Sequence, residues 1–412
     1  MRDLNTNLKN PNVLVMLPML LQRPTRAAIA ILFAISLGCI YLYSQSFNEA
    51  FHPRRDYHMS PALSKKYVQW DNNDHNEAMM HLSLPDMCKD IGLKRHWNSV
   101  HEPRRKVYDL VMFSTELDWL EIRLNEHRIY VDYFVIIESP TTFSGMPKSL
   151  VLKENWDKFK PFHDRIIYRV IEDPIISTRI WDHEDYLRNA LLYSVFPTLT
   201  DPAQKAYPGD VLIVSDMDEL LRQGTLLVLK YCAIPARLTL RSQFYYYSFE
   251  WKHRGEQWAH PEATLFSSSV STTIAPNDLR MNLLGPGWRL FAAYRRWRDH
   301  ATLWDAGWHC SSCFRTMREV QTKMQSFSHQ GWNTPETRDP RRIAERVRKG
   351  EDLVGREGEV YERVGDALGD LPGYVRHMYM EGPEGVRMKY LVNRTGEAAG
   401  FEDYDEMVGG VG

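Results

Sequence analysis

The chain has 412 residues, of which 25% are charged and 43% hydrophobic, and its formal net charge is -2 at pH 7. This length and composition predict a globular protein of one large or two ordinary domains. A nearly neutral chain without a large basic patch lacks the field that collects phosphates, which excludes a general nucleic-acid binder.

The first predicted element is a membrane anchor. The stretch Ala27 to Tyr43 is almost wholly apolar, and the uncharged run continues to Asn48. As a helix it spans roughly 26 Å, near the lower limit for crossing a bilayer. Two arginines just before it favour a cytoplasmic amino end, while a cleaved signal peptide is the alternative. We expect a cytoplasmic tail over residues 1–26, a transmembrane signal anchor over 27–48 and a lumenal remainder.

Residues 49–105 are polar and irregular, which is typical of a stem or linker that holds a domain away from a membrane. Four cysteines follow the anchor, namely Cys88, Cys232, Cys310 and Cys313. In an oxidising lumen they allow up to two disulfides, whose pairing the sequence leaves open. A zinc site at Cys310-x-x-Cys313 would need a second ligand pair at comparable spacing, which the chain lacks.

Strands and helices are predicted to alternate from Val107 to Leu220, because apolar runs alternate with apolar residues at helical spacing. The expected elements are strand Val107–Phe113, helix Leu117–Arg128, strand Val131–Glu138, strand Ile166–Glu172, helix Asp182–Phe196 and strand Val211–Val214. This order implies the α/β class, with a mostly parallel sheet and right-handed crossovers. Such an architecture is typical of nucleotide binding.

The pattern changes after Leu220. We expect strands over Thr239–Trp251 and over PGWRLFAAYRRWR, which begins at Pro286, with a Ser/Thr-rich loop over Phe266–Pro276 between them. Arg341–Lys349 resembles an exposed helix. The acidic, Gly-rich end of the chain, residues 396–412, is expected to be a disordered tail.

The sequence VLIVSDMDEL, Val211 to Leu220, ends a buried strand with three carboxylates. In open α/β sheets, ligands bind at the carboxyl ends of the strands. On extended backbone, Asp216 and Asp218 would point the same way and could share one divalent cation that bridges to a diphosphate. The alternative for an isolated Asp-x-Asp is a solvated loop or a helix cap.

Four ordered segments, YDLVMFSTELDWLEIRLNEH, VDYFVIIESPTTFSGMPKSL, DVLIVSDMDEL and AGWHCSSCF, together resemble glycosyltransferase family 17. The resemblance covers about Val107 to Leu391. It implies a GT-A-like nucleotide-sugar-binding fold in a lumenal domain over residues 106–395, a UDP-sugar donor, a divalent cation such as Mn²⁺, and inversion at the donor's anomeric carbon. It further implies a type II Golgi membrane enzyme that transfers N-acetylglucosamine from UDP-N-acetylglucosamine to a mannose of N-linked glycans in β-1,4 linkage.

The resemblance also implies a metal site. The family's acidic motif falls on Asp216, Asp218 and Glu219, and its Gly-Trp-His-Cys-x-x-Cys-Phe segment begins at Gly307. Asp218 is the expected direct metal ligand, and Asp216 is expected to meet the ribose or the metal through water. His309 either completes the metal shell or is an ordinary structural histidine. Ser215 stands where the family leads us to expect an acidic residue, which lowers the local charge.

Three further residues are expected at the nucleotide-sugar. Glu138 at a strand end and Arg123 on the first helix are expected to line the nucleotide cleft, and Trp308 to stack on sugar. The alternatives are a helix ion pair for Arg123 and core packing for Trp308.

An inverting transfer needs a base for the acceptor hydroxyl. The candidates are Asp182, Glu184 and Asp185 ahead of a helix, and Asp305 near His309. Helix capping is the alternative for the first three, and the sequence does not choose among the four.

Two other functions remain open at this point. One keeps the fold and transfers another hexose to a glycan. The other, from a different class, is a membrane-tethered glycan-binding protein whose catalytic machinery has decayed. Intact Asp216 and Asp218 argue against decay.

Overall fold

The computed structural model describes residues 55–59, 62–63, 84–94, 96, 105–177, 179–326, 333–365, 367–381 and 387–409. Residues 55–412 form one compact unit; a second unit, residues 1–54, lies outside the described residues, and with it the predicted tail and anchor. Within the described part of the chain, every helix is too short or too polar to cross a bilayer.

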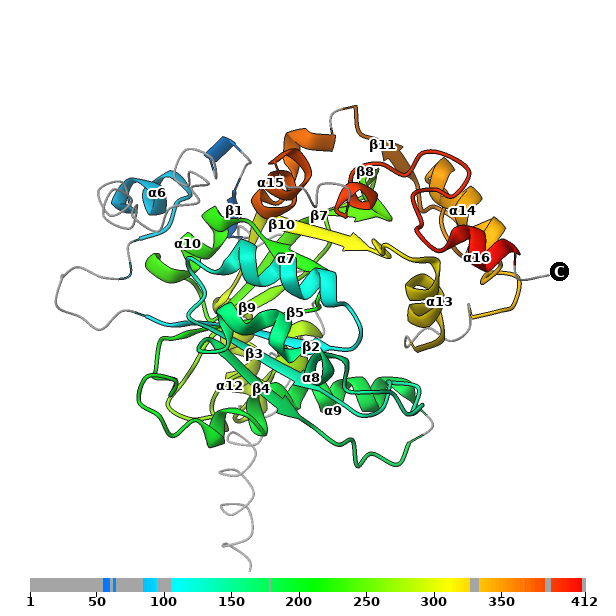
Figure 1. Ribbon diagram of the computed structural model, residues 1–412. Helices are drawn as coiled ribbons and strands as arrows, with labels where there is room; N and C mark the ends of the chain where they lie inside the picture. The colour runs from blue at the N-terminus through cyan, green and yellow to red at the C-terminus, as the bar shows by residue number, and fades with distance from the viewer. Residues whose placement is uncertain are drawn as a thin grey trace, which may run out of the picture. The chain divides into compact units, whose positions relative to one another are not determined.

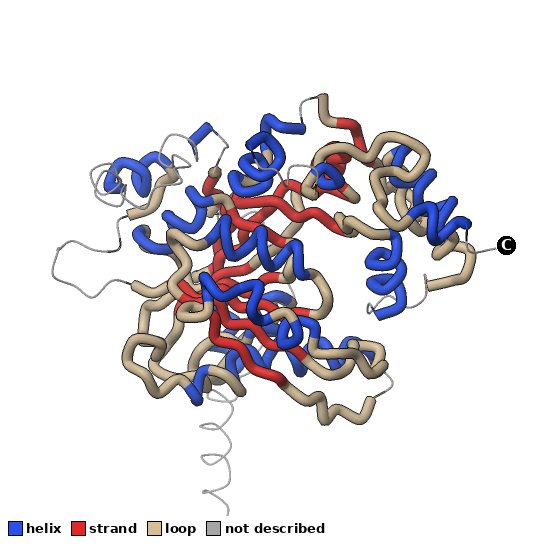
Figure 2. Tube along the Cα trace, in the orientation of Figure 1, coloured by secondary structure: helices blue, strands red, loops and turns tan. Residues whose placement is uncertain are grey.

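One mixed sheet of eleven strands organises the described residues (Figure 1, Figure 2). Its first part is parallel and has the order β4-β3-β2-β5. These strands are β2 (Val107–Phe113), β3 (Tyr133–Glu138), β4 (Ile166–Val170) and β5 (Val211–Ser215). All four coincide with predicted strands, because each is an apolar run long enough to cross the sheet once.

The second part of the sheet is mixed, so the expectation of a mostly parallel sheet holds only as far as β5. β9 (Glu262–Leu265) pairs antiparallel with β5, and β7 (Arg237–Tyr246) pairs antiparallel with β9. β10 (His300–Ser311) then runs parallel to β7. Three short strands complete this part, namely β6 (Glu219–Leu221) on β10, β8 (Ser248–His253) on β7 and β11 (Tyr361–Arg363) on β8.

The predicted strand Thr239–Trp251 is two strands, β7 and β8. They are separated at Tyr247, whose φ of 65° reverses the chain. The predicted loop over Phe266–Pro276 is confirmed: the structure has turns there, ending at the short helix α11 (Pro276–Arg280).

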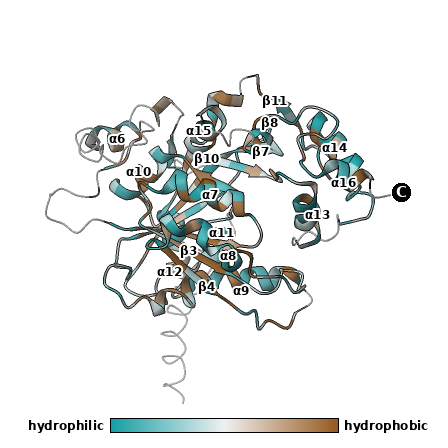
Figure 3. Cartoon of the chain, viewed as in Figure 1, coloured by the Kyte–Doolittle hydropathy of each residue, from teal (hydrophilic) through white to brown (hydrophobic). Residues whose placement is uncertain are grey.

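Both faces of β2, β3 and β5 are buried, and alternate residues face opposite sides. On β5, Val211 and Ile213 belong to one hydrophobic core, while Leu212 and Val214 belong to another. The first core also holds residues of α7 (Leu117–His127) and α10 (Gln223–Tyr231), and the second holds residues of α9 (Ile180–Tyr193) and α11. The hydrophobic colour of Figure 3 is strong along β3 and β4, as expected for strands covered on both sides.

A third core lies beyond the end of β10, where α13 (Met317–Ser326), α14 (Pro340–Lys349) and α16 (Tyr404–Gly409) gather (Figure 1). The helix predicted over Arg341–Lys349 is confirmed as α14, and it buries Ile343 and Val347. The expected disordered tail over residues 396–412 is wrong up to residue 409. Phe401 and Tyr404 pack into this core, because two aromatic rings supply apolar area that the acidic composition obscured.

The stretch that begins at Pro286 is a helix, α12 (Arg289–Arg298), and the predicted strand is wrong. Its large apolar side chains are exposed, Trp288 by 66% and Phe291 by 61%, so they do not mark a buried strand. Arg, Leu and Ala favour helices, and three arginines in the last turn interact favourably with the helix dipole.

The expected stem over residues 49–105 contains ordered elements. β1 (Asp56–His58) pairs parallel with β10 at the edge of the sheet. α6 (Leu84–Asp90) is tied to the end of α10 by a Cys88–Cys232 disulfide, with a Cα separation of 5.6 Å. The remaining helices are α8 (Val151–Glu154) and α15 (Gly373–Glu381), with 3-10 turns at Trp156–Phe162, Phe196–Thr198, Ala367–Asp370 and Lys389–Leu391.

Glu262 is expected to make the folded state less stable as pH rises. Its carboxyl is 6% exposed on β9 and accepts hydrogen bonds from Thr239 Oγ1 at 3.0 and 3.1 Å. Burial raises its pKa from 4.5 to about 8, so the folded protein keeps a proton that the unfolded chain has released. Its contribution to stability is therefore complete below pH 4.5 and is lost as pH rises towards about 8.

We expect Glu262→Gln, which stays neutral, to flatten this part of the pH dependence. The slope removed is at most about 1.4 kcal/mol of unfolding free energy per pH unit. Urea unfolding between about pH 5 and about pH 8 measures it. An identical slope in the variant and the unmodified protein would contradict the assignment.

Candidate active site

A cavity of about 550 Å³ opens at the carboxyl ends of the parallel strands. Residues 114–116 after β2, Ser139 after β3 and residues 216–218 after β5 all line it. This is the edge where open α/β sheets bind ligands. Other charged or aromatic lining residues include Glu184, Arg188, Arg241, Phe244, His253, Glu256, Trp258, His309 and Lys323.

The acidic motif forms a closed turn, and the prediction that Asp216 and Asp218 lie on extended backbone is wrong. β5 ends at Ser215 and β6 begins at Glu219, so only three residues connect them. Glu219 Oε2 accepts the Asp216 N–H at 2.8 Å, and the Glu219 N–H donates to Asp216 O at 3.2 Å. Glu219 therefore closes this turn with both its side chain and its backbone.

Arg123 fixes this turn through hydrogen bonds to its backbone carbonyls. Its side chain is fully buried and donates two hydrogen bonds of 2.8 Å to Asp109 on β2. Its Nη1 also donates to the carbonyls of Asp216, Met217 and Glu219 at 3.1, 3.3 and 2.9 Å. Arg123 does not line the cavity, so its place is that of a positioning residue and not that of a nucleotide contact.

The Asp109 carboxylate is the buried counter-ion of Arg123. Its second partner is His127, with Nδ1 at 2.9 Å from Oδ2. Burial by itself would raise the pKa of Asp109, but Arg123 and His127 outweigh burial and hold that pKa well below its usual value. Ser215 also contacts Asp109, at 3.3 Å, and it does not line the cavity. A serine in place of the expected acidic residue therefore changes the charge beside Asp109 and not the charge of the cavity lining.

A second network ties Asp216 and Glu219 to arginines. Arg280 of α11 donates to Asp216 Oδ2 at 2.5 Å and to both Glu219 oxygens at 2.8 and 3.0 Å. Arg188 of α9 lies 3.3 Å from Asp216 Oδ1. Burial raises and Arg280 lowers the pKa of Glu219, and the net effect is a pKa well below the usual value. Both carboxylates therefore have cationic partners within the protein.

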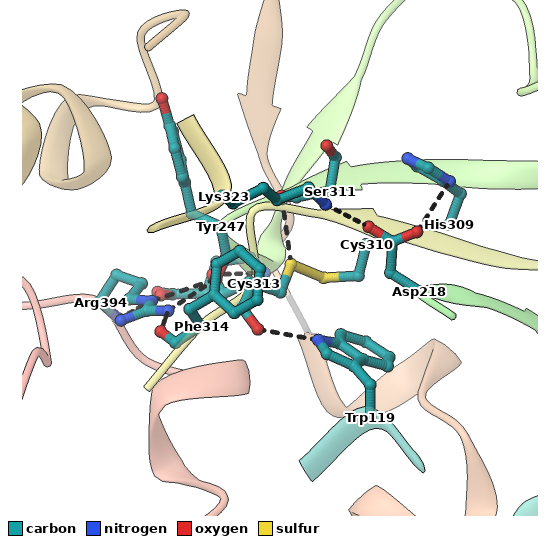
Figure 4. The surroundings of a disulfide bond; sticks show 12 residues. Trp119, Asp218, Tyr247, His309, Cys310, Ser311, Cys313, Phe314, Lys323 and Arg394 are labelled. Atoms are coloured by element: carbon teal, nitrogen blue, oxygen red, sulfur yellow. Dashed lines mark hydrogen bonds and ion pairs between the residues drawn. A yellow bond between two sulfur atoms is a disulfide. The ribbon is translucent and has the colours of Figure 1, made fainter. Parts of the chain in front are cut away.

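Asp218 lines the cavity together with His309. Its Oδ1 lies 4.0 Å from His309 Nδ1, and its Oδ2 accepts from Lys323 Nζ of α13 at 2.8 Å. Figure 4 shows Lys323 and His309 reaching Asp218 from opposite sides. Burial raises the pKa of Asp218, but the positive charge of Lys323 and the neighbouring His309 lower it by more. The pKa of Asp218 is therefore below its usual value.

His309 Nδ1 is a buried nitrogen without a hydrogen-bond partner among the described residues. It lies 3.8 Å from Glu219 Oε1 and 4.0 Å from Asp218 Oδ1, which is too far for hydrogen bonds. An imidazole nitrogen with an unused lone pair beside a carboxylate suits a divalent cation. In the described part of the chain no group of three or more His, Cys, Asp or Glu side chains forms a complete metal site. Among the described residues, Asp218 and His309 are the pair that suits a cation.

The disulfide Cys310–Cys313 braces the strand end that carries His309 (Figure 4). The Cys310 N–H donates to Asp218 O at 3.1 Å, and Trp119 Nε1 donates to Cys313 O at 3.0 Å. Ser312, with φ of 56°, turns the chain between β10 and the segment leading to α13. This turn fixes His309 and Lys323 on either side of Asp218.

Of the four base candidates, only Glu184 lines the cavity, and its carboxylate is paired with Arg188 at 2.6 Å. Asp182 lies in the first turn of α9 and accepts from Ser177 Oγ at 2.6 Å, but it caps no backbone N–H of the helix, so the capping alternative is not borne out. Asp185 does not line the cavity, and burial raises its pKa. Asp305 accepts from Gln243 and Gln257 at 2.5 and 2.7 Å within β10.

Glu138 and Trp308 also lie outside the cavity lining. Glu138 is fully buried and accepts from Tyr168 Oη at 2.6 Å and from the Leu152 N–H at 3.1 Å. Trp308 donates to Asp370 O at 3.0 Å, and the Arg222 guanidinium stacks 4.3 Å from its ring. Both side chains hold secondary-structure elements together.

Sequence reasoning missed the cations Lys323, Arg280 and Arg188. Arg188 carries one local signal, since it follows Glu184 by one helical turn. Lys323 and Arg280 are separated from their carboxylate partners by 105 and 61 residues. Only the folded chain brings them to the acidic turn.

The family profile described as Glycosyltransferase family 17 matches residues 24–274 and 287–372. Rat (Rattus norvegicus) and human (Homo sapiens) proteins named beta-1,4-mannosyl-glycoprotein 4-beta-N-acetylglucosaminyltransferase are each 26% identical to the chain over 227 residues. These alignments cover 52% of this chain, but only 41% of the rat and 42% of the human protein, so the chain spans about two fifths of the curated relatives' length. A solved structure of the mannosyltransferase PcManGT from Pyrobaculum calidifontis, in complex with GDP-Man and Mn2+, matches with 11% identity and a TM-score of 0.29. That match covers 85% of this chain and 90% of the other.

We expect Arg123→Met to destabilise the fold strongly. The variant leaves Asp109 buried without its main counter-ion and removes the donor from three carbonyls, so the expected loss is about 3–5 kcal/mol of unfolding free energy. Urea unfolding measures the loss. Arg318→Met is the matched control, because its side chain is 69% exposed and lies 3.9 Å from Glu406. A loss for Arg123→Met as small as the control's would contradict the role of Arg123.

Proposed function

The chain belongs to glycosyltransferase family 17 and is a glycosyltransferase, and from this premise we propose that it transfers N-acetylglucosamine from UDP-N-acetylglucosamine to a mannose of N-linked glycans. The proposed linkage is β-1,4, and the transfer inverts the anomeric carbon. The names of the curated relatives support this choice of sugar and acceptor.

One observation carries the proposal that the described cavity is the transferase site. Asp218 and His309 come from two separate family-like segments, DVLIVSDMDEL and AGWHCSSCF, and the fold brings them to one cavity at a distance of 4.0 Å. The cavity lies at the carboxyl ends of β2, β3 and β5, which supports a GT-A-like arrangement for nucleotide-sugar binding.

Asp218 and His309 are the residues that would hold a divalent cation, with Mn²⁺ as the proposed ion. The buried, unpartnered His309 Nδ1 supports this assignment. When bound, such an ion supplies positive charge for the diphosphate that leaves. Asp216 is not proposed as a direct ligand, because both its oxygens contact arginines.

The chain's own cations suit the phosphates of a nucleotide-sugar. Lys148, Arg188 and Lys323 all line the cavity, and they come from three different elements around the acidic turn. They are placed to bind and orient the diphosphate and to stabilise the negative charge that develops as it leaves. Ser114 and Ser139, at the ends of β2 and β3, offer hydroxyls for the nucleoside.

The proposed location is the Golgi membrane, with one amino-terminal signal anchor over residues 27–48 and the transferase domain in the lumen. The apolar composition of that segment supports the anchor. Two disulfides in the described chain, Cys88–Cys232 and Cys310–Cys313, are consistent with an oxidising compartment.

We expect UDP release from UDP-N-acetylglucosamine by the full-length purified chain, in the presence of Mn²⁺ and a mixed N-glycan pool. Asp218→Asn keeps the shape of the side chain but removes the charge that faces His309, so release should fall by at least about 100-fold. Mn²⁺ binding, followed by electron paramagnetic resonance, should weaken in the same variant. Asp405→Asn, at an exposed position on α16, is the matched control and should behave like the unmodified chain.

Two outcomes would contradict the proposal. Transfer that persists in Asp218→Asn and in a chelator would remove Asp218 from the metal site. A folded chain that binds no UDP and releases none from any common UDP-sugar would instead favour a decayed glycan-binding protein. Release from a different UDP-sugar would keep the enzyme and correct the donor.

A further inference from the structure

A second hollow, of about 460 Å³, lies beside the 550 Å³ cavity proposed for the nucleotide-sugar, the donor cavity. The two share four lining residues, Phe244, His253, Glu256 and Gln257. The shared residues belong to β7, the end of β8 and the segment that follows β8. The hollows are therefore neighbours separated by one wall, and a ligand in the second would lie next to a ligand in the first.

The second hollow is lined mainly by polar and charged side chains. Gln243, Lys252, Arg254 and Glu362 line it, and Phe244 adds an aromatic ring. Hydrogen-bonding groups around one ring suit a hydroxyl-rich ligand with an apolar face, which is the chemistry of a sugar. Phe244 itself is held in place, since it packs edge-on to His309 at 5.0 Å and tilted to Trp258 at 5.7 Å between ring centroids.

Among the described residues, Glu256 is the one carboxylate that lines both hollows. Its side chain is 81% exposed, and Arg241 Nη1 lies 3.1 Å from its Oε2. Arg241 is itself fixed, because it donates to Gln257 O at 2.8 Å and stacks 4.6 Å from the Trp304 ring. The carboxylate is thus oriented by one cation and open to solvent on the side from which an acceptor arrives.

The turn that carries Glu256 is fixed by close packing. A Cβ atom on Gly255 would lie 2.4 Å from Cε1 of the His253 ring, so only glycine fits there without movement. The Nε2 of His253 lies 3.1 Å from Glu359, which anchors the ring. A larger residue at 255 would have to displace either the His253 ring or the turn that carries Glu256.

The other acids at the donor cavity have partners that occupy them. Asp218 contacts Lys323 at 2.8 Å, and Glu184 contacts Arg188 at 2.6 Å; both are largely buried. Glu116 accepts the backbone N–H groups of Ser114 and Thr115 at 3.2 and 2.8 Å. Asp216 and Glu359 also line the donor cavity, and they contact Arg280 and His253, respectively. None of these five acids lines the second hollow, so none lies between the two sites.

We propose that the second hollow binds the acceptor sugar and that Glu256 is the catalytic base; this rests on the transferase function proposed above. In the step, the Glu256 carboxylate takes the proton of the acceptor hydroxyl as that oxygen bonds to the anomeric carbon of the donor. The bond from the anomeric carbon to the diphosphate oxygen breaks, and UDP leaves with its electron pair. Inversion requires that the acceptor oxygen attacks the face of the anomeric carbon opposite the leaving diphosphate.

The test compares Glu256→Gln with Glu345→Gln in the full-length chain. Glu345 is a matched control, because it lies on the exposed face of α14 and lines neither hollow. We expect Glu256→Gln to slow transfer to the N-glycan pool by about 10²–10⁴-fold, while UDP affinity measured by calorimetry stays within about twofold of the unmodified chain.

A second variant tests position independently of charge. Gly255→Ala keeps Glu256 but displaces its turn or the neighbouring His253 ring, which lines both hollows, so transfer should slow by about tenfold or more with UDP affinity retained. Transfer by Glu256→Gln within about threefold of the unmodified chain would overturn the assignment of the base. If the unmodified chain neither transfers sugar nor binds UDP, the proposed function fails and this inference fails with it. Transfer lost together with UDP binding in Glu256→Gln alone would also overturn it.

Discussion

The site depends on one buried ion pair, Arg123 with Asp109. The fork of Arg123 satisfies the carboxylate with two hydrogen bonds and still has a donor left for the carbonyls of the acidic turn. Three carbonyls that converge on one guanidinium fix the path of the chain between β5 and β6. That path decides which carboxylates face the cavity: Asp218 turns to His309, while Glu219 turns back to Arg280. A lysine could not make this set of contacts, because its ammonium lacks the planar fork.

The two halves of the sheet contribute different chemistry. The parallel half, from β2 to β5, presents strand ends that suit a nucleotide, and this arrangement follows from right-handed crossovers. The second half supplies what the first lacks, namely His309 at the end of β10 and Phe244 on β7. The site therefore exists only where the halves meet, and β6 joins them, since Glu219 on β6 pairs with His309 on β10.

The sequence predicted the parts of the fold that local pattern determines. β2, β3 and β5 are apolar runs between turn residues, and nothing else in a globular protein suits such runs better than a central strand. The helix α12 was missed because its apolar residues remain exposed, so hydrophobicity there carried no information about burial. Asp218 and His309 were named because family-like motifs contain them, and both line the cavity. Arg123 was named for the wrong role, since the sequence shows its charge but not that Asp109 and three carbonyls surround it.

The acceptor side is harder to predict from sequence than the donor side, and the reason is physical. A diphosphate and a cation demand charged groups at fixed places, which a short motif at a strand end can supply. A base for a sugar hydroxyl needs only a carboxylate at the right distance, and 53 Asp and Glu residues supply candidates throughout the chain. The four candidates chosen by proximity in sequence were Asp182, Glu184, Asp185 and Asp305, and only Glu184 reaches the cavity. Glu256 emerges only when two hollows are compared, because its distinguishing property is that both hollows share it.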